Sequence, residues 1–152
     1  MRHYGPEYTA MRQAVGYLVR RAYKLLLPRA EALFAQGDLS FSHWIALKMI
    51  DDGVSSTSAE IARSLCHNTG ATTRMIDQLE ERGLVRRSRS STDRRQIDLE
   101  ITGAGKAAIG AAQPRMADLW NHLLQDFDRE EVTTLVALLT RLVDRFEADL
   151  VK

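Results

Sequence analysis

Arginines crowd one short stretch of this chain. Residues 82–96 contain one acid, Asp93, and six arginines: Arg82, Arg86, Arg87, Arg89, Arg94 and Arg95. The local net charge is therefore +5, whereas the whole chain of 152 residues carries only +1. A guanidinium is a planar fork that can hold a phosphate through two hydrogen bonds, so this stretch is a candidate anion-binding surface. On charge alone, a solvated arginine face is the alternative.

A run of short polar residues precedes the arginines. Asn68 is a good N-cap for a helix over residues 69–82, which Gly83 would end. The apolar positions of this helix, Met75, Ile76 and Leu79, lie in its second half only. Its first half is small and polar and consists of Thr69, Gly70, Ala71, Thr72, Thr73 and Arg74. This asymmetry predicts a helix that packs through its C-terminal half and leaves its N-terminal half for another contact.

Short elements surround this helix and must position it. Thr57 and Glu60 form a T-x-x-E capping box that predicts a helix over residues 58–65. Residues 84–88 form a plausible strand, and residues 97–101 alternate strictly between apolar and polar, as a half-buried strand does. The two strands predict a β-hairpin whose tip carries the arginines.

The N-terminal part predicts two more helices. Apolar residues from Tyr8 to Leu25 recur at spacings of three and four, which is typical of a helix with one apolar stripe. We expect Pro28 to end or kink this helix, because proline lacks an N–H and crowds the preceding turn. Ser40 can cap a further helix over residues 41–51.

The C-terminal part is helical as well. Thr102 is expected to cap a helical stretch that Pro114 interrupts by a kink or a break. The last helix, about residues 128–150, carries a heptad-like apolar stripe. Such a stripe would be a costly exposed patch on a monomer, so it predicts pairing with a second copy of the chain.

This order of elements is typical of a DNA-binding lobe. Two short helices joined by a tight turn and followed by a hairpin suit a helix-turn-helix, whose second helix lies in the DNA major groove. Thr72, Thr73 and Arg74 offer hydroxyls, methyls and a guanidinium to base edges or phosphate. Arginines on a hairpin tip fit a narrow, electronegative minor groove. The sequence therefore predicts binding to double-stranded DNA.

The middle of the chain also resembles a known family. From Leu39 to about Ile109 it is similar to the MarR family of winged helix-turn-helix regulators, through SAEIARSL, TTRMIDQLEERGLVRR and STDRRQIDLEITGAGKAAI. The resemblance implies a mainly α fold with a small β-hairpin wing and N- and C-terminal dimerisation helices. The corresponding regions would be residues 1–38 for N-terminal dimerisation, 39–101 for the DNA-binding lobe and 102–152 for C-terminal dimerisation.

The resemblance also implies a function and site residues. It implies a homodimer that binds a pseudo-palindromic operator and represses transcription. A small aromatic or lipophilic ligand would release the repressor from DNA, as cysteine oxidation does in some members. Thr69 to Arg74 and Gln78 would face the major groove. Arg94 and Arg95 would serve the minor groove, with Asp93 orienting one of them. Cys66-His67 replaces the usual Gly-Leu, and Gly70-Ala71-Thr72 replaces the usual Ser-Thr-Val, which affects the operator sequence rather than the binding mode.

Several other residues have two possible roles. His43 and Trp44, on a helix between the lobes, and Tyr17 are candidates for lining an effector cleft, with core packing as the alternative. Cys66, the single cysteine, could be a redox switch, but the family's sensing cysteines usually lie in the first helix and this chain has none there. We therefore expect Cys66 to be a turn or core residue. The histidines show no metal-ligand spacing, and no cofactor is predicted.

The remaining alternatives concern the class of protein. No nucleophile elbow, phosphate-binding glycine loop or paired catalytic carboxylates occur, so an enzyme is not expected. The competing class is a winged-helix protein-interaction module without DNA binding, and a third is a small-molecule carrier built on a helical dimer. A free thiol, the absence of an apolar signal core and the absence of a membrane-span-length run predict a cytoplasmic protein without a membrane partner.

Overall fold

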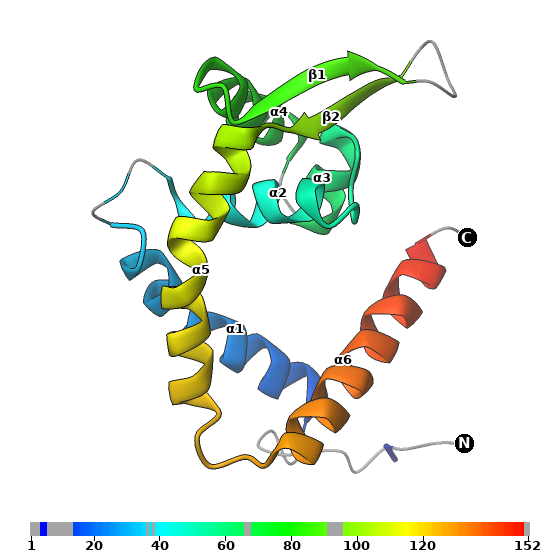
Figure 1. Cartoon of the computed structure of the whole chain (residues 1–152). Coiled ribbons are helices and arrows are strands. Elements are labelled where there is room, and N and C mark those ends of the chain that lie inside the picture. Colours follow the sequence, from blue (N-terminus) through cyan, green and yellow to red (C-terminus); the bar gives the residue numbers. More distant parts are fainter. Residues whose placement is uncertain are drawn as a thin grey trace. The chain divides into compact units, whose positions relative to one another are not determined.

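The computed structural model describes residues 4–5, 14–35, 37, 39–65, 68–90 and 96–150. The elements, in chain order, are α1 (Val15–Ala32), α2 (Phe41–Asp51), α3 (Ser58–Ser64), α4 (Thr69–Glu81), β1 (Val85–Arg89), β2 (Ile97–Ile101), α5 (Gly103–Leu123) and α6 (Arg129–Leu150) (Figure 1). The chain divides into two compact units, Met1–Pro114 and Arg115–Lys152, and α5 contributes to both.

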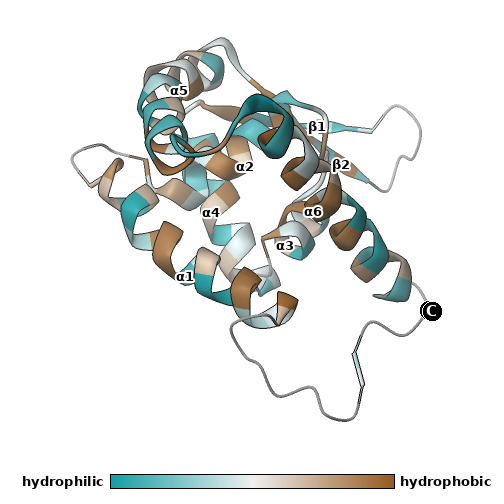
Figure 2. Cartoon of the chain, turned by 90° about the horizontal axis from the view of Figure 1, so that it is seen from below, coloured by the Kyte–Doolittle hydropathy of each residue, from teal (hydrophilic) through white to brown (hydrophobic). Residues whose placement is uncertain are grey.

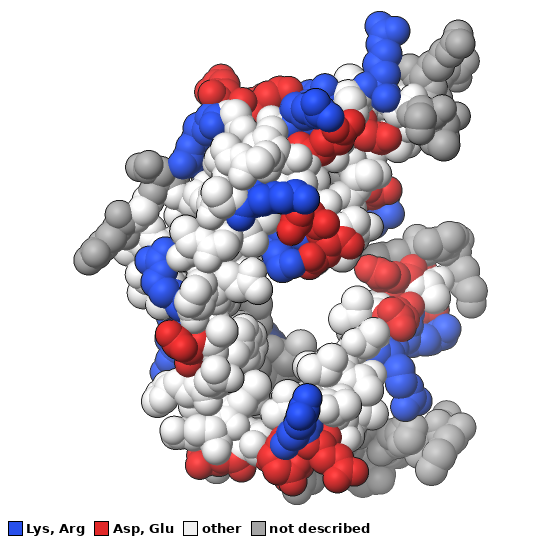
Figure 3. Space-filling model, in the orientation of Figure 1, with Lys and Arg blue, Asp and Glu red and all other residues white. Residues whose placement is uncertain are grey.

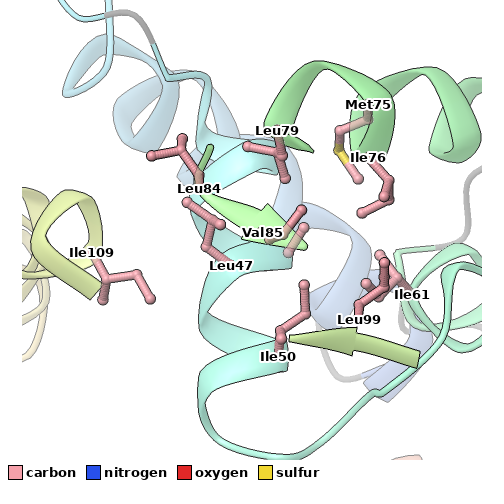
Figure 4. Packing of buried hydrophobic residues seen from close by; sticks show 11 residues of the cluster. Leu47, Ile50, Ile61, Met75, Ile76, Leu79, Leu84, Val85, Leu99 and Ile109 are labelled. Carbon is pink, nitrogen blue, oxygen red and sulfur yellow. The ribbon is translucent and has the colours of Figure 1, made fainter. Parts of the chain in front are cut away.

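The apolar core of the first unit lies where three short helices meet the hairpin (Figure 4). Side chains from α2, α3, α4, both strands and the start of α5 interdigitate there. Leu47, Ile61, Ile76 and Leu79 are fully buried. Burying one side chain of this size stabilises the fold by about 1.5–3 kcal/mol. The core therefore fixes α4 against the hairpin that follows it.

Each short helix begins at a residue that caps it. The side chains of Ser40, Thr57 and Asn68 accept hydrogen bonds from the backbone N–H groups of the first turns of α2, α3 and α4. The capping box between Thr57 and Glu60 is present: Thr57 Oγ1 accepts from Glu60 N–H at 3.2 Å, and Glu60 Oε2 accepts from Thr57 N–H at 3.0 Å. These predictions from the sequence are confirmed.

Neither of the two prolines ends or breaks its helix, which excludes that part of the prediction and leaves the predicted kinks untested. α1 continues through Pro28 to Ala32, and α5 continues through Pro114 to Leu123, so neither residue ends its helix. Each proline removes only one N–H donor from a helix of 18 or 21 residues. Near Pro28, the guanidinium of Arg29 donates to the Leu25 carbonyl at 2.5 Å.

The hairpin is a two-stranded antiparallel sheet. Val85 lies opposite Ile101, and Arg89 lies opposite Ile97. Leu99 is buried in the core, whereas Ile97, near the far end of the hairpin, is 55% exposed. The half-buried pattern predicted from the alternation therefore holds at the base of the hairpin and not near its end. The reason is that the hairpin extends beyond the helices that cover its base (Figure 1).

A close contact joins the hairpin to α5. The Thr102 hydroxyl donates to the Gly83 carbonyl at 2.7 Å and accepts from Gly105 N–H at 3.0 Å, so Thr102 caps α5 as predicted. Gly105 lies directly against this junction. A Cβ on it would come within 2.2 Å of the Leu84 carbonyl oxygen and 2.5 Å of Ile101 Cδ1. The start of α5 can therefore approach the hairpin because residue 105 has no side chain.

Large apolar side chains stay exposed on the long helices. Figure 2 shows brown segments along α1 and α6. The α6 stripe includes Leu135, Val136, Leu139, Val143 and Phe146, the last of them 60% exposed. On α1, the exposed apolar residues are Val15, Leu18, Val19, Tyr23 and Leu25. Among the described residues, no helix has the length and apolar character needed to cross a membrane.

Candidate nucleic-acid interface

The α4 helix has one buried and one exposed face. Thr72, Met75, Ile76 and Leu79 are buried and face the core. The exposed residues are Thr69, Gly70, Ala71, Thr73, Arg74, Gln78 and Glu81. All of these except Glu81 were predicted from the sequence as DNA-facing positions. The structure thus places six candidates on one accessible surface of a single helix that is held by its opposite face.

Thr72 is the one candidate on this helix that lies on its buried face. Its side chain is fully buried, and its hydroxyl donates to the Asn68 carbonyl at 3.3 Å. The expectation that this side chain faces DNA is therefore wrong. Position 72 lies three, four and seven residues before the buried positions of α4, so it belongs to the same apolar stripe. A threonine can occupy it because its methyl packs while its hydroxyl bonds within the helix.

The exposed polar groups are ordered by bonds within the helix. The Asn68 side chain accepts from Ala71 N–H at 2.7 Å, and the Thr73 hydroxyl donates to the Thr69 carbonyl at 2.9 Å. Arg74 Nε donates to the Gly70 carbonyl at 3.3 Å, so this side chain runs back along the helix toward its N-terminus. Helix N-termini favour anions, and Arg74 places a positive charge at the same end.

Gln78 is linked to α2 by a side-chain contact that crosses the lobe. Its Oε1 lies 3.2 Å from Nε2 of His43. The other ring nitrogen, Nδ1, accepts from Ser40 N–H at 3.1 Å and so completes the capping box of α2. Partial burial lowers the pKa of His43; the hydrogen bond to Gln78 opposes this shift, and the charge of Arg82 adds to it. No local pattern in the sequence indicates this link, because the partners lie 35 positions apart.

Two of the clustered arginines form ion pairs with acidic residues of the same lobe, Arg87 partly buried and Arg86 exposed. Arg87 forms ion pairs with Asp77 at 2.6 Å and with Glu80, and so joins β1 to α4. The hydrogen bond to Asp77 is the main reason that the pKa of Arg87 is raised. Arg86 donates from Nε to Glu100 on the neighbouring strand at 2.8 Å. Positive and negative side chains are accordingly interspersed over the hairpin part of the molecule (Figure 3).

The other predicted wing residues divide into two groups. Arg89, at the end of β1, is exposed. Asp93, Arg94 and Arg95 lie outside the described residues, as do Cys66 and His67. The geometry of the predicted minor-groove contact is therefore not part of the described structure.

The three residues predicted to line an effector cleft, Trp44, His43 and Tyr17, make contacts with different partners. Trp44 joins Phe34 and Phe41 in an aromatic cluster with ring centroids 5.9–6.3 Å apart, and its Nε1 donates to the Ile109 carbonyl at 3.4 Å. His43 is adjacent in sequence and bonds to Ser40 and Gln78 instead. Tyr17, on α1, accepts from Arg21 on its own helix at 3.4 Å. In the described ranges, no group of three His, Cys, Asp or Glu residues could hold a metal ion.

The core helices, the accessible α4 surface and the hairpin beside it define a winged helix-turn-helix protein. Residues 39–97 match the family model described as the MarR family.

Curated proteins and solved structures support this assignment. The chain is 25% identical to the HTH-type transcriptional repressor NicR of Pseudomonas putida over 139 residues, which cover 89% of this chain and 85% of NicR. It is similar to the crystal structure of the transcriptional regulator BldR of Sulfolobus solfataricus, with a TM-score of 0.75 and 26% identity. The match covers 86% of this chain and 93% of the BldR chain. A structure of Bordetella bronchiseptica BpsR, described for the regulation of its DNA binding by 6-hydroxynicotinic acid, has a TM-score of 0.72 at 21% identity. The match covers 92% of this chain and 99% of the BpsR chain.

Proposed function

We propose that the chain is a MarR-family transcriptional regulator, a homodimer that binds a pseudo-palindromic DNA operator and represses transcription until a small aromatic or lipophilic effector releases it. The observation that carries the proposal is the division of α4 into a buried stripe and an exposed polar face. A helix held in this way can enter the major groove without losing its place in the core. The exposed face offers short side chains near its N-terminus, where base edges are reached first.

Dimer formation is supported by the exposed apolar residues. The stripe on α6 includes side chains that are 40–60% exposed, such as Leu135 and Phe146. A contiguous apolar surface on a helix is costly in water and is typical of a protein–protein interface. A two-fold dimer places two recognition helices about 34–36 Å apart, one turn of DNA, and so implies a pseudo-palindromic site.

Repression and effector release are supported by the relatives. NicR is named a repressor, and BpsR is described as having its DNA binding regulated by an aromatic acid. In this chain, the aromatic cluster of Phe34, Phe41 and Trp44 provides flat apolar surfaces beside α2. An effector that binds better to a dimer geometry unable to engage DNA would shift the population away from the bound form.

The test is fluorescence-anisotropy binding to the DNA upstream of the protein's own gene, at two salt concentrations, beside a random duplex. We expect salt-sensitive binding that prefers the upstream DNA. Arg74→Ala should weaken this binding about tenfold or more. Arg145→Ala, on α6, makes the same change of charge in the other compact unit and should have little effect. Failure of the wild-type protein to bind either duplex at low salt would favour a protein-interaction module instead.

A further inference from the structure

The contact between His43 and Gln78 fixes the orientation of a side chain on the DNA-facing surface. Gln78 is exposed on α4, while His43 is half-buried on α2. The two side chains meet at 3.2 Å, between Nε2 of the ring and Oε1 of the amide. An exposed glutamine normally rotates its terminal amide freely. Here a second helix holds one end of that amide.

The hydrogen bonds at the other ring nitrogen determine which tautomer His43 adopts. Ser40 N–H donates to Nδ1 at 3.1 Å, so Nδ1 presents a lone pair, and the Ser40 hydroxyl, 2.9 Å from the same nitrogen, then lies on its acceptor side. In the neutral ring the proton is then on Nε2, which donates to Gln78 Oε1. The lowered pKa of His43 favours this neutral ring near pH 7. The capping box of α2 therefore sets the direction of the bond to Gln78.

This bond decides what Gln78 can offer to DNA. Because its oxygen is turned toward His43, its amide nitrogen, with two N–H donors, is the end left for a ligand. In the major groove, guanine presents two acceptors, adenine presents the acceptor N7 and thymine presents the acceptor O4. Cytosine presents a donor, its N4 amino group. Two donors facing each other cannot form a hydrogen bond.

We propose that His43 is a specificity-positioning residue: it holds Gln78 as a hydrogen-bond donor and so excludes cytosine from the base position that Gln78 contacts. The inference rests on the proposed function, because it requires α4 to lie in the major groove. His43 itself does not touch DNA in this arrangement. It acts through Gln78, and its effect is a change of base preference rather than a change of general affinity.

The experiment selects binding sites from a randomised duplex library with the full-length protein, followed by sequencing. Gln78→Ala identifies the contacted position as the one at which the base preference is lost. His43→Gln retains a capping box, because glutamine at this position of the helix can still accept from Ser40 N–H. Glutamine lacks the rigid ring that carries a donor from this cap to Gln78, so residue 43 holds the Gln78 amide less firmly. Thr73→Ala is the matched control, since it alters the same surface of α4 without touching the link.

We expect wild type to disfavour cytosine about tenfold at the contacted position, as one good base contact allows. In His43→Gln this factor should fall to about threefold or less, with the other positions unchanged. The double variant should match Gln78→Ala. Gln78→Glu, which leaves the fold of α2 untouched, should reverse the preference toward cytosine, because a carboxylate accepts from the cytosine amino group.

The outcomes separate this inference from the proposed function. If wild type selects no sequence at all, the proposed function fails. If a sequence is selected but His43→Gln keeps the full discrimination against cytosine, the positioning role is wrong. Equal weakening of every site by His43→Gln would assign His43 a structural role only. An unchanged preference in both Gln78 variants would likewise overturn the inference, because Gln78 would then contact no base.

Discussion

Replacing Gly105 with alanine tests the contact that joins the hairpin to α5. The added Cβ would lie 2.2 Å from the Leu84 carbonyl oxygen and 2.5 Å from Ile101 Cδ1. The Ile101 side chain can rotate, but the carbonyl belongs to the backbone at the start of the hairpin. An ordinary contact begins near 3.4 Å. The helix and the hairpin must therefore separate by about 1 Å at this point.

The size of the effect follows from two opposing terms. Overpacking that shifts the backbone costs about 1–3 kcal/mol. Alanine gains up to about 1 kcal/mol over glycine in a helix, and this gain is smaller in the first turn, where Gly105 lies. We expect a net loss of about 2 kcal/mol in the free energy of unfolding. For a chain of 152 residues, this corresponds to a fall in Tm of about 4–8 °C.

The assay is urea unfolding and thermal melting followed by circular dichroism, at one fixed protein concentration because the proposed dimer couples Tm to concentration. Gly110→Ala is the matched control. It lies further along α5, where an added Cβ meets nothing within 4 Å, so it should keep or raise the stability by up to about 1 kcal/mol. If Gly105→Ala were as stable as Gly110→Ala, the close contact between α5 and the hairpin would be refuted.

Three further perturbations test the capping and electrostatics of the lobe. Thr57→Ala should lower the free energy of unfolding by about 1 kcal/mol, since it removes one half of a capping box; an unchanged urea midpoint would contradict this. Arg87→Met should cost about 1 kcal/mol, through loss of its ion pairs to α4, and the loss should shrink in high salt; a salt-independent loss would point to packing instead. The pKa of His43 is lowered in the folded state, so the unfolded state binds the proton more readily and stability should fall as pH decreases below about 6.5. The variant His43→Gln should lack this part of the pH dependence in urea titrations between pH 5 and 8.

Local features of the fold were predictable because neighbouring residues determine them. A cap needs only its own side chain and the backbone three residues ahead, so Ser40, Thr57 and Asn68 could be recognised in the sequence. The boundaries of α2 and β2 matched for the same reason: a cap or a strict alternation marks them. The prolines were less predictable, since a long helix tolerates one missing hydrogen bond when its packing holds it together.

The candidate site was predictable in position but not in its contacts. Five exposed residues in the first half of α4 were predicted from its small, polar character, and Gln78 was predicted from the family resemblance. Thr72 was misplaced because its type is polar while its spacing is that of the core. The pairing of Arg87 with Asp77 could not be found from local charge, because the partners lie on different elements. An arginine cluster in the sequence therefore overstates the positive charge that is available to DNA.

The two faces of α4 also have a consequence for protein engineering. Asp77 and Glu80 hold Arg87 of the hairpin, and they belong to the same helix as the DNA-facing residues. A chimera that replaces α4 as a whole would remove the partners of Arg87 and so weaken the support that these ion pairs give to the hairpin. A graft limited to positions 69–71, 73 and 74 would leave that support intact. Position 78 is the exception, because any residue transplanted there would have to be chosen together with its partner at position 43.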